Sequence, residues 1–194
     1  MNIPQCFLVG RRNKFVMKTE KTNLFCDFFK AFSYVVLRKC SKNEELQKKH
    51  HKFEKFKYKI CTDSEFIKHV EECCEKAKWH VIYGMLAIFE VCMIKSNEEQ
   101  IVSFRIAISY NESEEQDERL KMCRVLESIE NFELPQETKI RLNTSKFRPR
   151  IRLLTKHSTE SSEFDYSDLI SNISIPLTDS FFTSKTKLSF FVCN

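Results

Sequence analysis

The sequence predicts an α+β fold in which three helices pack on a mostly antiparallel sheet and a strand-rich segment closes the chain. Three observations predict this class. Apolar residues recur at helical spacing in three separate segments, two adjacent segments near the middle have the patterns of paired strands, and the last two dozen residues contain two strand-like segments. Hydrophobic residues fill 42% of the 194 positions and include 18 phenylalanines, so a sizeable core can form.

The first predicted helix runs from Thr22 to about Lys39, and its broad apolar face predicts a central, largely buried position. The apolar residues are Leu24, Phe25, Phe28, Phe29, Phe32, Val35 and Val36. The segment from Ser41 to Lys55 is dense in Lys, Glu and His and is predicted to be a solvated loop or a frayed helix end. Phe56, Tyr58 and Ile60 then alternate with lysines, as they would in a short strand.

The second predicted helix begins at a capping box formed by Thr62 and Glu65, in which each side chain satisfies a backbone donor at the helix start. Met85 to Ile94 is almost continuously apolar, as expected for a strand that is covered on both faces. After a turn at Ser96 to Glu99, apolar and polar residues alternate from Val102 to Tyr110. These two segments are predicted to pair as a hairpin.

Ser113 and Gln116 offer a second capping box, and the third predicted helix continues until Pro135 ends it. Lys146 to Thr155 alternates arginines with aliphatic residues. Pro149 within it predicts an edge strand or a strand start, because proline cannot donate a ladder hydrogen bond. Two short strand-like segments close the chain: Ile173 to Leu177 and Lys187 to Cys193.

Composition excludes several classes of site. Only two glycines occur, Gly10 and Gly84, so neither a glycine-rich phosphate loop nor a Rossmann turn can form. No C-x-x-C pair occurs, although a structural zinc site usually needs two such ligand pairs. We therefore expect no cofactor and no metal.

Charge and cysteine usage bear on partners and location. The net charge of +5 is mild and does not by itself indicate nucleic-acid binding. The longest apolar stretch, Met85 to Ile94, is about ten residues, far below the roughly 20 that cross a bilayer, so no membrane span is expected. Cys6 to Val9 is too short an apolar core for a signal peptide. The nine cysteines favour free thiols in a reducing compartment, so we expect the nucleus, the cytoplasm or both.

The order of these elements, and residues within them, resemble the HORMA domain. Thr22 to Phe29 is similar to the central helix of the family, and Phe56 to Val70 to the strand that leads into its second helix. The hairpin Leu86 to Ser109 is similar to the central hairpin of the family. Leu134 with Pro135 matches the end of its third helix, and the ending Ile175 to Val192 matches its C-terminal strands. The resemblance implies an N-terminal extension over residues 1–17 and one domain over 18–194. The core would be residues 18–156, and 157–194 would be a safety-belt-like segment, meaning the C-terminal part that wraps around a bound peptide.

The resemblance implies a non-enzymatic adaptor. In the closed HORMA state a partner's extended peptide adds a strand to the sheet, and the C-terminal segment folds over the peptide and pairs on the far side. The residues implied to form this peptide-binding latch are Ile173, Ile175, Leu177, Leu188, Phe190 and Val192. The alternative is that they belong to ordinary core strands of a static sheet. Arg124 is implied to lie on a surface that forms HORMA homodimers or heterodimers, and the alternative is a solvated surface arginine.

Three branches of the family fit in different ways. The last twenty residues most resemble the accessory subunit of translesion DNA polymerase zeta, which implies a role in translesion synthesis and the DNA damage response. The spindle-assembly-checkpoint branch is the second interpretation. The autophagy-initiation branch is the third, favoured by the lack of a Tyr-Pro after the first helix. The segment between Lys156 and Ile173 is short for a full safety belt.

Two other chemistries compete with this interpretation: nucleic-acid binding and thiol catalysis. The strongest local charge feature is the basic series Lys139, Arg141, Lys146, Arg148, Arg150, Arg152 and Lys156. Alternating arginines can follow a phosphate backbone, but they equally mark a protected edge strand, and no aromatics interleave with them for stacking. Direct nucleic-acid binding is therefore not expected. Cys73 or Cys74 could act as a nucleophile with His69, but both thiols lie on an apolar helix face, where burial makes thiols inert.

Overall fold

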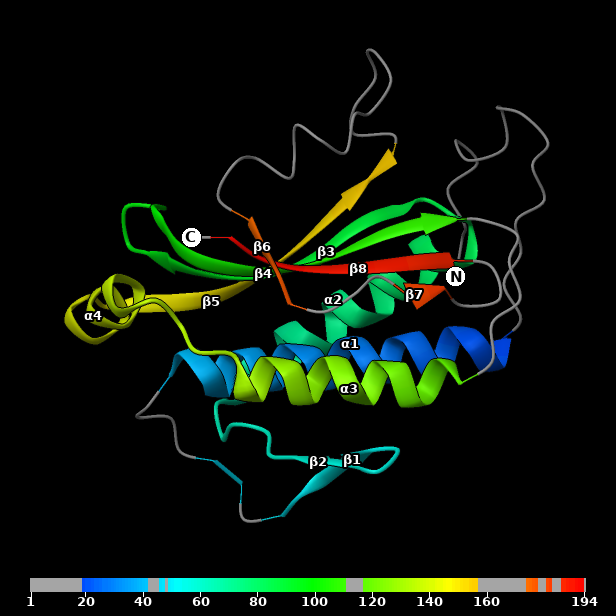
Figure 1. Ribbon diagram of the computed structural model, residues 1–194, viewed down its shortest axis with the longest axis horizontal. Helices are drawn as coiled ribbons and strands as arrows, with labels where there is room; N and C mark the ends of the chain where they lie inside the picture. The colour runs from blue at the N-terminus through cyan, green and yellow to red at the C-terminus, as the bar shows by residue number, and fades with distance from the viewer. Residues whose placement is uncertain are drawn as a thin grey trace.

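The computed structural model describes residues 19–41, 46–47, 49–110, 117–156, 174–177, 181–182 and 186–193 (Figure 1). The helices are α1 (Thr19–Cys40), α2 (Ser64–Ile82), α3 (Glu118–Asn131) and α4 (Gln136–Thr144). The strands are β1 (His51–Phe53), β2 (Phe56–Tyr58), β3 (Leu86–Lys95), β4 (Gln100–Tyr110), β5 (Phe147–Thr155), β6 (Ser174–Pro176), β7 (Phe181–Phe182) and β8 (Thr186–Cys193). The predicted α+β class is confirmed.

The main sheet is antiparallel at every described pairing and has the strand order β5-β3-β4-β8-β6, with β7 also paired to β8. The β3–β4 hairpin, which the apolar patterns of its two strands predict, is confirmed and lies between β5 and β8. β5 pairs with β3 over its whole length and is the outermost strand on that side. The Pro149 argument for an edge strand is therefore confirmed. β1 and β2 form a separate two-stranded hairpin.

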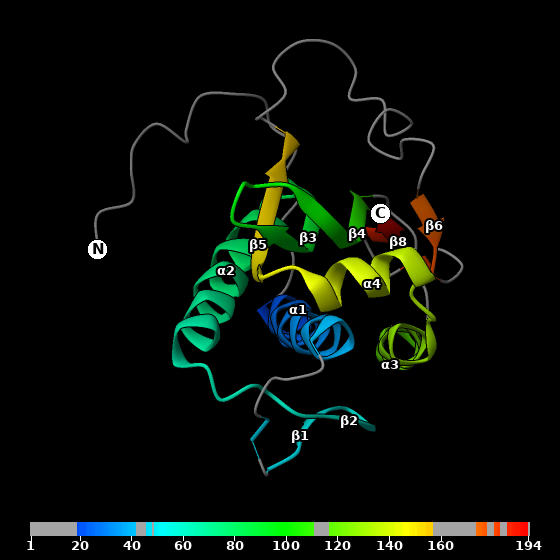
Figure 2. The same ribbon diagram turned by 90° about the vertical axis from the view of Figure 1, so that its left-hand side faces the viewer.

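The core lies between the sheet and α1. Figure 2 shows α1 below the sheet with α2 and α3 on either side and the β1–β2 hairpin beneath. The four phenylalanines at positions 25, 28, 29 and 32 are fully buried, which explains why the apolar face of this helix is so broad. Phe29 stacks on Phe89 of β3 with ring centroids 4.4 Å apart, and Phe28 meets Phe190 of β8 edge to face at 6.1 Å.

Three elements lie outside those that the sequence predicts: α4, β1 and the two-residue strand β7. α4 begins directly after Pro135, so the described chain has four helices where three were expected. Only Thr138 and Leu142 are buried in α4, and so short an amphipathic signal is easily missed. β1 lies inside the Lys-rich segment expected to be a loop or helix end. It forms there because Phe53 is buried against Phe28, with ring centroids 5.7 Å apart.

The helix starts also differ from the predicted capping boxes. The cap of α2 is Asp63, whose carboxylate accepts hydrogen bonds from the backbone N–H groups of Glu65 and Phe66 at 2.9 and 3.2 Å. The box at Thr62 and Glu65 was therefore placed one residue too early. The second proposed box, Ser113 and Gln116, lies outside the described residues. α3 begins after Asp117, which has a left-handed backbone (φ 70°) and makes no side-chain cap.

Candidate functional site

The outer edge of β5 is the longest strand edge in the described sheet without a described partner strand. β5 has nine residues, whereas β6 at the opposite end of the strand order has three. An edge strand presents a row of backbone N–H and C=O groups that a further extended chain can pair with. The β5 edge, meaning the side of Phe147–Thr155 that faces away from β3, is therefore the candidate site.

One hydrogen bond fixes which residues of β5 point outward. The Ile151 N–H donates to Nε2 of His69 on α2 at 3.3 Å instead of to β3. Residues of an antiparallel pair alternate between bonding to their neighbour and pointing away from it. Phe147, Pro149 and Leu153 therefore share the outward orientation of Ile151. Pro149 stands where its missing N–H costs the β3–β5 ladder nothing.

The two faces of β5 differ sharply in chemistry. Ile151 is buried in the core, and Phe147 and Leu153 pack against it on the face toward the helices. Arg148, Arg150 and Arg152 occupy the alternate positions and lie on the opposite face. A strand added to the β5 edge would thus meet apolar groups on one face and guanidinium groups on the other.

The arginines are held by carboxylates from the hairpin. Arg148 and Arg150 both bind Glu98 at the β3–β4 turn, the second through an Nη1 to Oε2 distance of 2.7 Å. Arg152 lies 3.5 Å from Oε2 of Glu90, and Arg105 of β4 bonds the other Glu90 oxygen at 2.7 Å. These contacts hold the arginines in place along the edge strand.

His69 lies between α2 and the β5 edge. Burial lowers its pKa below the ordinary value of 6.5, and Lys76 and Arg150 lower it further, while Glu72 opposes them. The neutral ring can accept the Ile151 hydrogen bond, and a protonated ring cannot. Cys73 Sγ is 3.8 Å from both ring nitrogens, but burial raises the pKa of this thiol, which therefore remains protonated at neutral pH.

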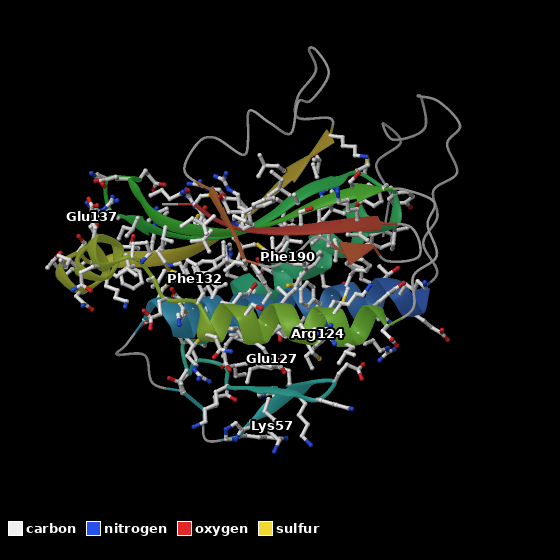
Figure 3. The ribbon with its side chains drawn as sticks, in the orientation of Figure 1. Lys57, Arg124, Glu127, Phe132, Glu137 and Phe190 are labelled. Carbon is white, nitrogen blue, oxygen red and sulfur yellow. The ribbon has the colours of Figure 1, made fainter. Side chains whose placement is uncertain are left out.

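The predicted latch residues fall into two groups. Leu188, Phe190 and Val192 are fully buried in β8, which pairs directly with β4 on one side and with β6 and β7 on the other. Figure 3 shows Phe190 between the sheet and the helix layer. Ile175 is 41% exposed, Leu177 is half-buried, and Ile173 lies outside the described residues. The Leu177 N–H donates to the Phe190 carbonyl at 3.0 Å, which extends the β6–β8 pairing.

The direct β4–β8 pairing limits where a foreign strand can enter, because the register from Ser103 with Cys193 to Tyr110 with Thr186 leaves no space for a peptide between the hairpin and β8. Instead, the chain leaves β5 at one edge and reaches β6 at the other after residues 157–173. Crossing four strand spacings requires about 19 Å, and 17 extended residues reach roughly 55 Å. The connection is long enough to pass around a strand added to β5.

Arg124 lies on the exposed face of α3, close to Glu127, as Figure 3 shows. Both side chains point away from the core, so this face is available for contact with another molecule. No sequence signal identified the contact of His69 with β5, because 82 residues separate His69 from Ile151.

Two further properties concern the described residues alone. Across the helices of the described chain, none is long and apolar enough to span a membrane. A search of the same residues finds no group of three or more His, Cys, Asp or Glu side chains arranged to hold a metal.

No family model matches the sequence, and no curated protein matches it. Solved structures do resemble the fold. A chain of a mitotic checkpoint complex has a TM-score of 0.58 and 12% identity, with 90% of this chain and 98% of that chain covered. Caenorhabditis elegans HTP-1 bound to the HIM-3 closure motif gives 0.59 and 14%, covering 92% and 91%. HTP-2 from the same organism, bound to the same motif, gives 0.61 and 12%, covering 93% and 92%. At this level of identity the comparison concerns architecture, and the chain has the fold of HORMA-domain proteins.

Proposed function

We propose that this chain is a non-enzymatic adaptor of the HORMA type, which binds an extended segment of a partner protein as an additional strand along the β5 edge. The observation that carries the proposal is the arrangement of the sheet. Nine residues of β5 have no described partner strand on their outer side, where the Ile151 N–H bonds to His69 of α2, while the C-terminal strands are paired at the opposite side of the hairpin. Backbone hydrogen bonds would supply affinity, and side chains of β5 and α2 would supply specificity.

The position of the C-terminal strands supports this mechanism. They pair on the far side of the sheet from β5, as the closed HORMA arrangement requires. Residues 157–173 connect the two edges along the chain and lie outside the described residues; they belong to the segment that the resemblance implies as the safety belt. Leu188, Phe190 and Val192 would hold the far end of this latch through burial. Ile175 and Leu177 lie in the strand that pairs with it, and Ile173, proposed for the same latch, lies outside the described residues. The structures of HTP-1 and HTP-2 bound to closure motifs give the same class of ligand for proteins of this fold.

The strand-addition proposal can be tested with peptides selected by display on the full-length chain. A peptide that pairs with β5 points its N–H groups alternately toward and away from the strand. Single N-methyl substitutions along the selected peptide should therefore weaken binding at every second residue and leave the residues between unaffected. An N-methyl scan without this alternation would contradict strand addition.

Substitutions in β5 test the same backbone pairing by changing the protein instead of the peptide. Leu153→Pro removes an outward N–H without breaking the ladder to β3, and Leu153→Ala loses the same packing while keeping that N–H. We expect the proline variant to bind the selected peptide about tenfold more weakly than the alanine variant, because one backbone hydrogen bond to the peptide is lost. Equal affinities for the two variants would place the peptide elsewhere.

The biological branch follows from the same proposal. We place the adaptor in genome maintenance, with translesion synthesis and the DNA damage response first. The checkpoint branch is the alternative that the mitotic checkpoint complex among the similar structures favours. Autophagy initiation is the third branch. The informative partners are those that Leu153→Ala recovers from a lysate and Leu153→Pro does not. A polymerase or chromatin factor among them would support the first branch, a checkpoint protein the second, and an autophagy scaffold the third.

The exposed face of α3 is the proposed dimer surface. Arg124 and Glu127 lie nearly one helical turn apart, so two copies related by a twofold axis could pair each arginine with the partner's glutamate. Sedimentation of the wild-type chain and of Arg124→Glu tests this directly. The wild type should show a dimer that the variant lacks, and restoration by adding Glu127→Arg would identify the pairing.

The remaining proposals concern the domain bounds and the compartment. We take residues 1–17 as an extension and 18–194 as one domain. The eight cysteines at described positions are buried and form no disulfide, which supports a reducing compartment such as the nucleus or cytoplasm. Fluorescence imaging of the tagged full-length chain would show where it resides.

A further inference from the structure

We propose that the β5 edge selects peptides with carboxylates at alternate positions and apolar residues between them. The inference rests on the proposed strand addition and assigns the chemistry of the ligand. Its basis is the row formed by Arg148, Arg150 and Arg152, called here the arginine row. The three side chains are 60%, 42% and 37% exposed, so each retains surface for a further contact.

The carboxylates around the arginine row do not balance its charge. Glu98 serves both Arg148 and Arg150, and Glu90 serves both Arg152 and Arg105. The neighbouring Glu99 is shared by Lys95 and Arg141 at 2.9 and 2.6 Å. Among the described residues, six cationic side chains thus share three carboxylates at this end of the sheet. These three carboxylates all come from the hairpin side of β5, so they do not occupy the outer side of the row.

The spacing of the row matches that of a bound strand. Alternate residues of a strand are about 6.8 Å apart and point to the same face. A peptide paired with β5 would place every second side chain beside the arginine row. Opposite charges stabilise such cross-strand pairs and like charges destabilise them. The intervening side chains would face the helix layer beside Phe147, Ile151 and Leu153, which favours apolar residues there.

A peptide suits this site better than a nucleic acid does. The arginine row coincides with an outward-facing backbone edge, which offers carbonyl acceptors as well as N–H donors; a peptide backbone can pair with both, whereas phosphate oxygens accept only from the donors. The aromatic residue of β5, Phe147, packs on the opposite face, so within the described strand no ring lies among the arginines for a base to stack on.

Three labelled peptides test the inference on the full-length chain. Each has nine residues, the length of β5, with valine at the even positions and glutamate, glutamine or lysine at the odd ones. Fluorescence anisotropy at low salt should show the glutamate peptide binding about tenfold tighter than the glutamine peptide, since several cross-strand pairs each add a small gain. The lysine peptide should bind more weakly still. The preference should shrink at high salt.

A matched pair of variants locates the effect. Arg148→Gln with Arg150→Gln should reduce the preference for the glutamate peptide over the glutamine peptide to within about twofold. Lys52→Gln with Lys57→Gln removes the same charge from the β1–β2 hairpin, on the far side of the helix layer (Figure 3). This control should leave the preference unchanged. If both double variants lower it equally, the effect is one of net charge and the arginine row is not a specificity site.

The remaining outcomes separate the two proposals. If the glutamate peptide fails to bind, or binds no better than the other two peptides, the proposed acidic specificity is wrong. Strand addition would still be supported if the N-methyl scan of the selected peptide showed the alternating pattern. If that scan fails as well, the proposed function fails with it. A single-stranded oligonucleotide that displaces the glutamate peptide, and that depends more strongly on Arg148 and Arg150, would assign the row to nucleic acid and overturn the inference.

Discussion

Glu90 is the one buried charged residue among the described residues of the sheet. Its side chain is 2% exposed and sits in β3 between Arg105 on β4 and Arg152 on β5. The register places all three residues directly opposite one another, so one carboxylate links the hairpin to the edge strand. A buried carboxylate is tolerated only when such partners compensate for its lost hydration. The position of the arginine row therefore depends on Glu90.

Replacing Glu90 with glutamine should lower the free energy of unfolding by about 2 kcal/mol, because both guanidinium groups lose a charged partner. Urea denaturation measures this change. Glu98→Gln is the matched control, since Glu98 also serves two arginines but is 51% exposed, and its loss should cost less than about 1 kcal/mol. Equal costs for the two variants would mean that burial of Glu90 adds nothing to the strength of its pairs.

His69 makes the stability of the fold dependent on pH. Burial holds the pKa of His69 below 6.5 in the folded chain, so the unfolded chain binds more protons between the two pKa values. Stability should therefore be complete above about pH 6.5 and should fall as the pH decreases below it. His80 shifts in the same direction through burial and contributes to the same loss. The charged groups that act on His69 are Glu72, Lys76 and Arg150.

The variant His69→Gln isolates the contribution of this ring. An uncharged amide can still accept the Ile151 hydrogen bond, but it does not titrate. Denaturation between pH 7.5 and 5.5 should show a shallower loss of stability in the variant than in the wild type, with the remaining slope due to other groups such as His80. An unchanged slope would show that the His69 contact does not contribute to the pH dependence.

At the scale of elements, the start of α2 is set by one carboxylate. Asp63 accepts two backbone hydrogen bonds, and Asp63→Ala should destabilise the chain by about 1 kcal/mol. Asp63→Asn preserves the acceptor and should cost much less. Thermal unfolding compares the two variants. The structure of this cap shows why the sequence was ambiguous: Thr62 and Asp63 are adjacent and both are good cap residues, and backbone geometry chooses between them.

Elements with strong periodicity could be predicted, and elements stabilised by distant contacts could not. The α1 face, the β3–β4 hairpin and the edge position of β5 follow from spacing of apolar residues and from Pro149. β1 depends on the contact between Phe53 and Phe28, which lie far apart in the sequence. α4 has only two buried residues, too few to produce a pattern.

The candidate site shows the same division. The alternation of arginines in β5 could be read from the sequence, and it indicated either a protected edge or a charged binding surface. The sharing of Glu98 by Arg148 and Arg150 could not, because it depends on how the β3–β4 turn approaches β5. Nor could the sequence tell which latch positions are buried, since that depends on β8 having strands on both sides.

Across the whole molecule, β8 connects the C-terminal segment to the centre of the core. Phe190 is fully buried and contacts Phe28 of α1. Phe190→Ala should lower the free energy of unfolding by about 4 kcal/mol, the usual cost of removing a buried phenylalanine. Ile175→Ala on the 41% exposed position should cost less than about 1 kcal/mol. Similar costs would indicate that β8 is no better anchored than β6.

The same anchoring decides whether the chain can fold without residues 157–194. Leu188, Phe190 and Val192 are all fully buried, and together their removal costs more than about 6 kcal/mol, comparable with the whole stability of a typical domain. It would also expose the β4 edge along eight paired residues. A chain ending at Lys156 should therefore lack a cooperative thermal transition by circular dichroism, whereas a chain lacking only residues 1–17 should keep one. A sharp transition in the chain that ends at Lys156 would show that the core folds without the C-terminal strands. The latch could then leave the sheet without unfolding it.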